Sequence, residues 1–156
     1  MKNTMIFLFF YCPSIVLACS CIGKSMINSE IKKTDVLFLG KVLSKKTFSM
    51  KIEYLPEEFY PKKIEYKVLV TKKYKGNIIT DTLKIVTGIG SGDCGFNFLI
   101  DHSYIIYGMY SEKRLESREK VNEFIETDIC TRTRLYDCLE EKKIVRYLRR
   151  HPIDKI

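Results

Sequence analysis

The segment VLFLGKVLSKK, residues 36–46, gives the clearest indication of the fold. It is rich in aliphatic and aromatic residues that favour strands, and we expect it to form one. Gly40 interrupts the segment, and a glycine inside a strand often marks a bulge or a sharp bend of the sheet. A second interior glycine, Gly108, lies in the similar segment SYIIYGMY at residues 103–110. The two glycines favour a strongly curved sheet.

Outward from this segment, strand and helix patterns follow one another without a linker or an internal repeat. Further strands are predicted over residues 64–74, 80–86, 103–110 and 121–130, with a charged loop at 111–120. A short helix is predicted over 25–34 and a longer one over 134–150. In the longer one, one apolar face is expected from Leu135, Leu139, Val145 and Leu148, which recur at roughly helical spacing. We therefore expect a mainly β domain with flanking helices, whose five strands form a small closed barrel.

The beginning of the chain has the pattern of a secretory signal peptide. Lys2 precedes an apolar stretch, and Val16 and Ala18 are acceptable residues before a cleavage site. The stretch is too short for a good membrane span, and no second candidate span follows. We expect residues 1–18 to be a signal peptide and residues 19–156 to be one exported domain. The alternative is a lipid anchor, because residues 16–19 partly fit a bacterial lipoprotein box that would acylate Cys19.

Six cysteines are present, and Cys12 would leave with the signal peptide. The other five suggest two disulfides and one free thiol in an oxidising compartment. Cys19 and Cys21 are two residues apart, so an extended backbone places both sulfurs on one face and Ser20 on the other. Their natural distant partners are Cys94 and Cys130. Cys138 would stay unpaired, and its place in a helical pattern favours a buried thiol over an intermolecular bridge.

Charge and motifs exclude several classes of function. The net charge of +8 is spread over the chain among acidic residues, which indicates a solvated surface, so we expect no nucleic-acid partner. Gly90, Gly92 and Gly95 match the spacing of a dinucleotide-binding loop, but an aromatic, β-rich segment follows where that loop needs a helix. We interpret them as a turn around Cys94. No catalytic or zinc-protease motif is present, and we expect no enzyme activity and no bound metal.

Several segments together resemble the tissue inhibitor of metalloproteinases family, in its short single-domain form. They begin with Cys19-Ser20-Cys21 after the signal peptide and span nearly the whole exported chain. The others are TDVLFLGKV (34–42), YKVLVTKKYKG (66–76), SGDCGFNFLIDHSYIIYG (91–108) and TDICTRTRLYD (127–137). The resemblance implies a netrin-like OB-fold barrel. It also implies the disulfides Cys19–Cys94 and Cys21–Cys130.

The resemblance further implies a mechanism of protease inhibition. The α-amine and carbonyl of Cys19 would chelate the catalytic zinc of a target metalloprotease, and the side chain of Ser20 would enter its specificity pocket. The ridge around them would include Cys21, Ser91, Gly92, Asp93, Cys94 and Gly95. The expected protein is a secreted monomer, in the periplasm or at the cell surface if bacterial, whose partner is a zinc metalloprotease. The alternative function is a netrin-like module that binds protein, glycan or another polyanion without inhibiting anything.

Two other groups of residues have simpler interpretations. His102 and His151 lie in a predicted turn and at a predicted helix end, and neither has a metal-binding neighbour in sequence. The segment TRTR at 131–134 could bind an anion. We instead expect Thr131 or Thr133 to cap the last helix while Arg132 and Arg134 pair with nearby acids.

Overall fold

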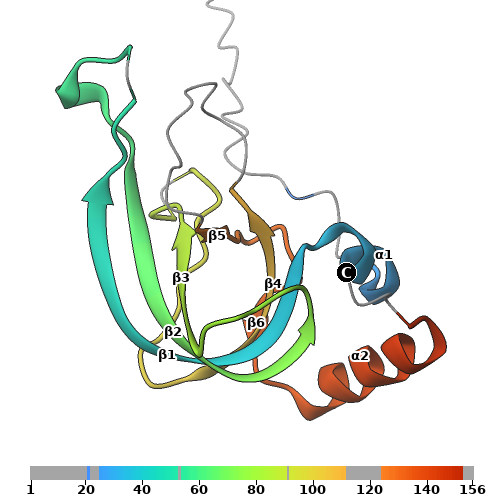
Figure 1. Ribbon diagram of the computed structural model, residues 1–156. Helices are drawn as coiled ribbons and strands as arrows, with labels where there is room; N and C mark the ends of the chain where they lie inside the picture. Colours follow the sequence, from blue (N-terminus) through green and yellow to red (C-terminus); the bar gives the residue numbers. More distant parts are fainter. Residues whose placement is uncertain (1–20, 22–24, 53, 91, 112–123, 153–156) are drawn as a thin grey trace, which may run out of the picture.

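The computed structural model describes residues 21, 25–52, 54–90, 92–111 and 124–152 (Figure 1). The predicted signal peptide, Cys19, Ser20, Ser91 and almost all of the predicted charged loop lie outside these residues. Within the described residues, nine elements form in the order α1 (Ile27–Lys33), β1 (Val36–Ser49), η1 (Glu57–Phe59), β2 (Lys62–Lys75), β3 (Thr82–Thr87), β4 (Ser103–Tyr110), β5 (Ile125–Glu126), β6 (Arg134–Leu135) and α2 (Cys138–Arg150).

The strands form one six-stranded sheet, which confirms the predicted mainly β architecture with two helices. Its order is β1-β2-β3-β5-β4-β6, and β1 also pairs with β4, so five strands are linked in a ring. The link through β5 is short, with two residues paired to β3 and two to β4. The ring is therefore not a clear barrel. The pairing of β1 with β2 shifts register between Leu39 and Gly40, at the predicted irregularity.

Alternating side chains of β1 and β4 build two separate cores. Phe38 and Ile106 belong to a cluster enclosed by the curved sheet. Leu37 and Tyr107, their neighbours in sequence, belong to a second cluster between the sheet and the helices. Successive strand residues point to opposite faces, so β4 is buried on both of them. This explains the unbroken apolar run of its sequence.

The two helices cover the outer face of β1 and β4 (Figure 1). Ile31 of α1 and Ile144 of α2 are fully buried against this face. Leu139, which the helical pattern placed on the buried side of α2, is 62% exposed, and Glu140 is buried instead. Among the described residues, no helix combines the length and the apolar character needed to cross a membrane.

Two predicted boundaries near the C-terminus are wrong. A strand was expected over 121–130, but within 124–130 only Ile125 and Glu126 pair. Thr127–Cys130 instead form a turn, because the carboxylate of Asp128 accepts hydrogen bonds from the two backbone N–H groups that follow Ile129. The cap of α2 is Asp137, whose carboxylate accepts a hydrogen bond from Leu139 N, so neither threonine of the TRTR segment caps the helix.

Glu141 accepts three side-chain hydrogen bonds, two of which join α2 to β2 and one of which comes from the segment before α2. Lys72 Nζ donates to Oε1 at 2.6 Å, Tyr74 Oη donates to Oε1 at 2.8 Å, and Tyr136 Oη donates to Oε2 at 2.8 Å. The hydrogen bond from Lys72, supported by those from the tyrosines, lowers the pKa of Glu141 to about 2. The Glu141 side chain is 17% exposed, so solvent screens part of this interaction.

We predict that Glu141→Gln lowers the free energy of unfolding by about 1–2 kcal/mol at pH 7. A depressed carboxyl pKa stabilises the folded state above the pKa of the unfolded chain, and this stabilisation is lost as the pH falls toward 2. The difference between wild type and variant should therefore shrink between about pH 4.5 and pH 2. Urea unfolding at several pH values measures it, and a difference that stays constant down to pH 2 would contradict the prediction.

Candidate functional site

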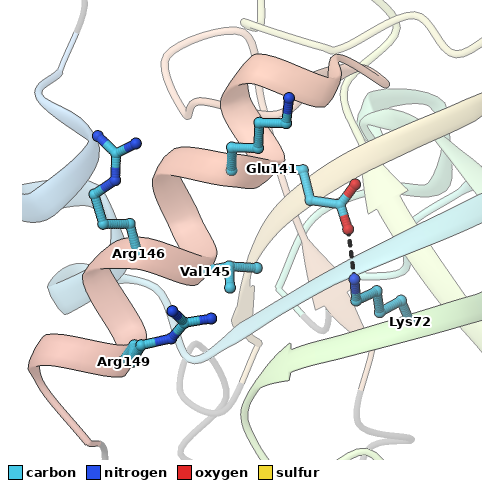
Figure 2. A pocket seen from close by; sticks show the side chains of 6 residues that line it. Lys72, Glu141, Val145, Arg146 and Arg149 are labelled. Carbon is cyan, nitrogen blue, oxygen red and sulfur yellow. Dashed lines mark hydrogen bonds and ion pairs between the residues drawn. The ribbon is translucent and has the colours of Figure 1, made fainter.

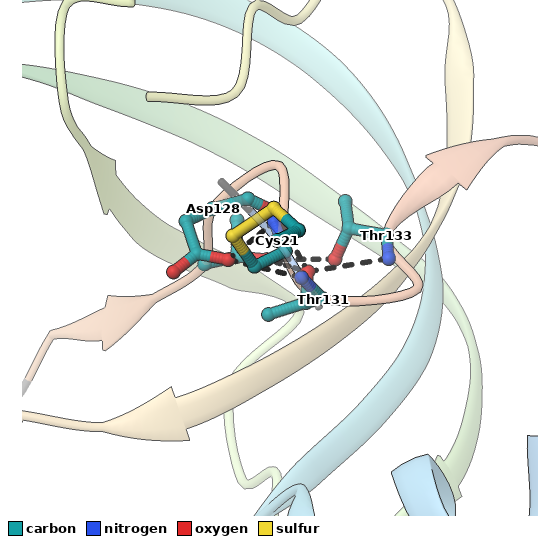
Figure 3. The surroundings of a disulfide bond; sticks show 6 residues. Cys21, Asp128, Thr131 and Thr133 are labelled. Carbon is teal, nitrogen blue, oxygen red and sulfur yellow. Dashed lines mark hydrogen bonds between the residues drawn. A yellow bond between two sulfur atoms is a disulfide. The ribbon is translucent and has the colours of Figure 1, made fainter. Parts of the chain in front are cut away.

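A disulfide ties the beginning of the domain to the segment that precedes β6. Cys21 and Cys130 are 109 residues apart in the chain, and their Cα atoms are 5.1 Å apart. This is the pairing that the resemblance implied for Cys21. The bond lies over the turn of Asp128 and the threonines that follow it (Figure 3). Asp128 Oδ1 accepts from Cys130 N at 2.8 Å and from Thr131 N at 2.9 Å, so the backbone at the disulfide is held firmly.

The hydroxyl groups of three threonines in and after this turn are hydrogen-bonded to one another. Thr127 Oγ1 lies 2.9 Å from Thr131 Oγ1 and 2.7 Å from Thr133 Oγ1, and it donates to the carbonyl oxygen of Tyr107 at 3.0 Å. Thr127 and Thr133 are buried. The turn that carries Cys130 is therefore fastened to β4, since Tyr107 belongs to that strand.

The glycine-rich segment after β3 forms a second turn, organised by Asp93. Its carboxylate accepts hydrogen bonds from Ile89 N and Gly90 N, both at 2.8 Å, and from Gly95 N at 3.3 Å. Desolvation alone would raise the pKa of Asp93, but these hydrogen bonds and the nearby charge of Lys63 outweigh it and lower the pKa. Asp93 was predicted as part of the inhibitory ridge. Its carboxylate is hydrogen-bonded to backbone N–H groups of its own turn.

Gly95 lets this turn fold back on itself. A Cβ atom on Gly95 would lie 2.2 Å from the carbonyl oxygen of Gly88, so no larger residue fits without moving the backbone. Cys94 adopts a positive φ of 58°, and Gly90 and Gly92 also have positive φ. The predicted turn around Cys94 is therefore present, and no helix follows it among residues 96–111.

The two turns meet directly. Ile129 N donates a hydrogen bond to the carbonyl oxygen of Cys94 at 3.0 Å. We call the resulting surface, formed by Cys21, Gly92–Gly95 and Asp128–Cys130, the cysteine ridge. The ridge has an apolar margin, because the side chains of Ile129 within it and of Ile89 beside it are 49% and 46% exposed.

The structure brings together all five of the predicted ridge residues that it describes. Cys21, Gly92, Asp93, Cys94 and Gly95 all belong to the cysteine ridge. Cys94 is disulfide-bonded, and its partner lies outside the described residues, as do Cys19, Ser20 and Ser91. Cys138 lies elsewhere, at the start of α2, where it is a free thiol. It is exposed, so the expectation of a buried thiol is wrong.

Arg132 holds the segment that follows Cys21. Its guanidinium donates from Nη1 to the carbonyl oxygen of Ser25 at 2.7 Å. Its Nε and Nη2 atoms donate to the two carboxylate oxygens of Glu140, each at 2.8 Å. Arg134 also pairs with acids, Asp137 at 3.6 Å and Glu140 at 3.9 Å, so both arginines pair with nearby acids as expected.

Glu140 is buried, and its carboxylate accepts hydrogen bonds from Arg132 and Tyr107. Burial raises its pKa, but the hydrogen bonds from Arg132 and from Tyr107 Oη at 3.0 Å outweigh burial and hold the pKa below its usual value. Burial in turn raises the pKa of Tyr107, and the adjacent Glu140 raises it further. The network anchors the segment after Cys21 to both α2 and β4.

Asp128, Ile129 and Arg132 belong to the site, although they were not predicted as parts of it. The pattern Asp128-x-x-Thr131 is a usable turn signal, because an aspartate can accept from backbone N–H groups two and three residues onward. Nothing in the local sequence indicates that Ile129 meets Cys94 or that Arg132 reaches Ser25, since both contacts are long-range.

The hairpin of β1 and β2 extends toward the same end of the molecule as the turn after β3 (Figure 1). Ile64 pairs with Thr87 at the end of β3, so the connection after Ser49 projects beyond that strand. Tyr54 and Phe59 are 82% and 64% exposed in this connection. The hairpin is close enough to the ridge for the charge of Lys63 to influence Asp93. It therefore forms an aromatic projection beside the cysteine ridge.

No protein-family model matches this sequence, and no curated protein matches it. Among the described residues, no three His, Cys, Asp or Glu side chains are arranged to hold a metal ion. The two histidines contact backbone carbonyls, His102 with Ile100 and His151 with Tyr147. At the cysteine ridge, the described features are a disulfide, two turns held by hydrogen bonds and exposed apolar side chains.

We predict that Asp93→Ala destabilises the protein by about 1–2 kcal/mol, because three backbone N–H groups lose their acceptor. Asp93→Asn is the matched control. It keeps one acceptor oxygen and should lose less than half as much. Urea unfolding measures the stability, and faster amide hydrogen exchange at Gly90 and Gly95 would locate the change. Equal stability of the alanine variant and the wild type would refute a bracing role for Asp93.

Proposed function

We propose that this protein is a secreted, single-domain inhibitor of zinc metalloproteases with an OB-fold barrel, and that its mature N-terminus is Cys19. In this proposal the α-amine and carbonyl of Cys19 coordinate the zinc of the target enzyme. Ser20 enters the specificity pocket beside the zinc. The inhibitor has no metal of its own, and it is not an enzyme.

One observation supports this proposal above the others. The disulfide Cys21–Cys130, together with the hydrogen bond from Ile129 N to Cys94 O, fixes a residue two positions after Cys19 on a ridge of two braced turns. A chelating terminus needs such an anchor, because an unanchored chain end would lose conformational entropy on binding. Arg132 adds a second anchor at Ser25, on the other side of Cys21.

The chemistry of the interaction is that of an open zinc site. Catalytic zinc in proteases keeps one position for water or substrate. An amine and a carbonyl oxygen on the same residue can replace that water as a five-membered chelate. Free α-amines have pKa values of about 7.7–8.0, so removal of the proton costs little near neutral pH. Metal binding then favours the neutral amine.

The fold also fits the proposal. Five strands paired in a ring, with a register shift at Gly40, have the connectivity that a small barrel needs. The exposed Ile89 and Ile129 margins would contact the walls of an active-site cleft. Tyr54 and Phe59, on the hairpin beside the ridge, would offer a second contact outside the cleft.

Two measurements test the proposal. Mass spectrometry and N-terminal sequencing of the exported protein should show an unmodified Cys19 as the first residue. Titration of that material into a panel of zinc metalloproteases should then give tight, stoichiometric inhibition of at least one. A lipid on Cys19, or an additional residue before it, rules out chelation. A free Cys19 with no inhibition across the panel would leave the alternative, an extracellular interaction module of the same fold.

A further inference from the structure

A second candidate site lies on the other side of the molecule, between α2 and β2. An open cavity of about 400 Å³ lies along α2, beside Lys72 of β2. Figure 2 shows its lining, with Val145 between the charged side chains. We call it the helix groove, and its lining residues are Lys72, Glu141, Lys142, Val145, Arg146 and Arg149. In Figure 1, α2 lies far from the turn after β3 and thus from the cysteine ridge.

The groove has an excess of positive charge that the described part of the chain does not neutralise. Lys72 is balanced by Glu141, at 2.6 Å. Lys142, Arg146 and Arg149 are exposed, and none of them makes an ion pair or a side-chain hydrogen bond with a described residue. Glu141 cannot turn toward the arginines without losing its hydrogen bonds to Tyr74 and Tyr136.

Helix stability does not account for this arrangement. Residues 142, 146 and 149 are spaced by four and three, which places them on one face of α2. Like charges at these spacings repel each other and disfavour the helix. The helix dipole favours cations in the last turn, which explains Arg149, but it does not favour Lys142 near the beginning. The cationic stripe therefore suggests a ligand outside the chain.

We propose that the helix groove binds a sulfated polysaccharide. The stripe from Lys142 to Arg149 spans about 10 Å along the helix axis, which suits an extended chain with several anionic groups better than one small ion. Guanidinium groups bind the oxygens of tetrahedral oxyanions in pairs, and sulfate esters offer such oxygens. The carboxylate of Glu141 at the edge of the groove can accept hydrogen bonds from sugar hydroxyls.

Other polyanions fit the groove less well. None of its lining residues is aromatic, so unpaired nucleic-acid bases would have no surface on which to stack. The cations line a recess beside the sheet, whereas a flat anionic membrane is contacted best by protruding side chains. A polysaccharide chain can follow the recess and leave the cysteine ridge free.

Binding to heparin and its fragments tests this proposal on the full exported protein. We expect Arg146→Ala/Arg149→Ala to weaken binding of a heparin decasaccharide at least about tenfold. We also expect a shallower dependence of log K on log salt concentration, by about one to two, because two ionic contacts are lost. The matched control, Lys45→Ala/Lys46→Ala, removes the same charge from an exposed part of β1 and should change binding less than about twofold. Thermal unfolding should show both double variants folded.

Several results would overturn the proposal. They are no binding of heparin by the wild type, equal weakening by the two double variants, equal binding of desulfated heparin, and binding of phosphatidylserine vesicles in place of heparin. The result of the heparin test does not depend on whether the protein inhibits a protease. Arg146 and Arg149 lie away from the cysteine ridge, so their double variant should inhibit a target protease as strongly as the wild type does.

Discussion

One alanine added before Cys19 is expected to weaken inhibition of a target metalloprotease at least about 100-fold, or by about 3 kcal/mol of binding free energy. The extension converts the α-amine into an amide, whose nitrogen has no lone pair available for zinc. It also adds bulk where the proposed chelate needs a vacant zinc position. The measurement is the inhibition constant of the extended and the native protein against the same enzyme.

A cleavable form of the same extension provides the control. Removal of the added residue by a site-specific protease regenerates Cys19 and should restore the native inhibition constant. The Cys21–Cys130 disulfide should be intact in both forms, since it is independent of the extension. If the extended protein inhibits within about threefold of the native one, zinc chelation by Cys19 is wrong. Contacts elsewhere, such as Tyr54 and Phe59, would then have to provide the binding.

Removal of the Arg132 side chain should destabilise the fold by about 3–5 kcal/mol, because it leaves a buried carboxylate without its main partner. Glu140 is only 2% exposed and accepts two hydrogen bonds from Arg132. Tyr107 and the more distant Arg134, at 3.9 Å, compensate the charge only in part, and the carbonyl oxygen of Ser25 loses its donor as well. Urea unfolding of Arg132→Ala against the wild type measures the loss.

The pH dependence separates a buried charge from a simple packing defect. In the wild type the pKa of Glu140 is depressed, so Glu140 stabilises the fold above the unfolded pKa and loses this effect as the pH falls. Without Arg132, burial should raise the pKa of Glu140, and protonation would then relieve the penalty. The destabilisation by Arg132→Ala should therefore begin to shrink above about pH 4.5, as the raised pKa is approached from neutral pH, and should shrink further below that pH as the wild-type carboxylate is protonated.

An exposed ion pair is the matched control for Arg132. Lys41 pairs with Asp101 at 3.1 Å, but the two side chains are 43% and 75% exposed. Lys41→Ala should cost less than about 1 kcal/mol at any pH, because solvent already screens that pair. A loss of similar size for both variants would show that the Glu140 network contributes no more than a surface pair.

Local sequence patterns predicted the strands more accurately than they predicted which face of α2 is buried. The apolar run of residues 103–110 was long enough to identify β4 with its bounds. The pattern of α2 was misread, since Leu139 is exposed and Glu140 is buried. A buried glutamate is unfavourable unless it is paired, and its partners Arg132 and Tyr107 come from other elements. Such a pairing has no signature in the helix itself.

The chain alone specified the mainly β class, the two helices, and the cysteine pattern that suggested two bridges and one free thiol. These depend on side-chain periodicity, glycine positions and cysteine spacing, which act over a few residues or through composition. Tertiary structure alone decided that the turns of Asp93 and Asp128 join at Ile129 and Cys94, and that Arg132 fastens the segment after Cys21. It also placed the cations of α2 around a groove beside β2. Each of these features depends on groups that are distant in sequence, and only the folded sheet brings them within hydrogen-bonding or electrostatic range.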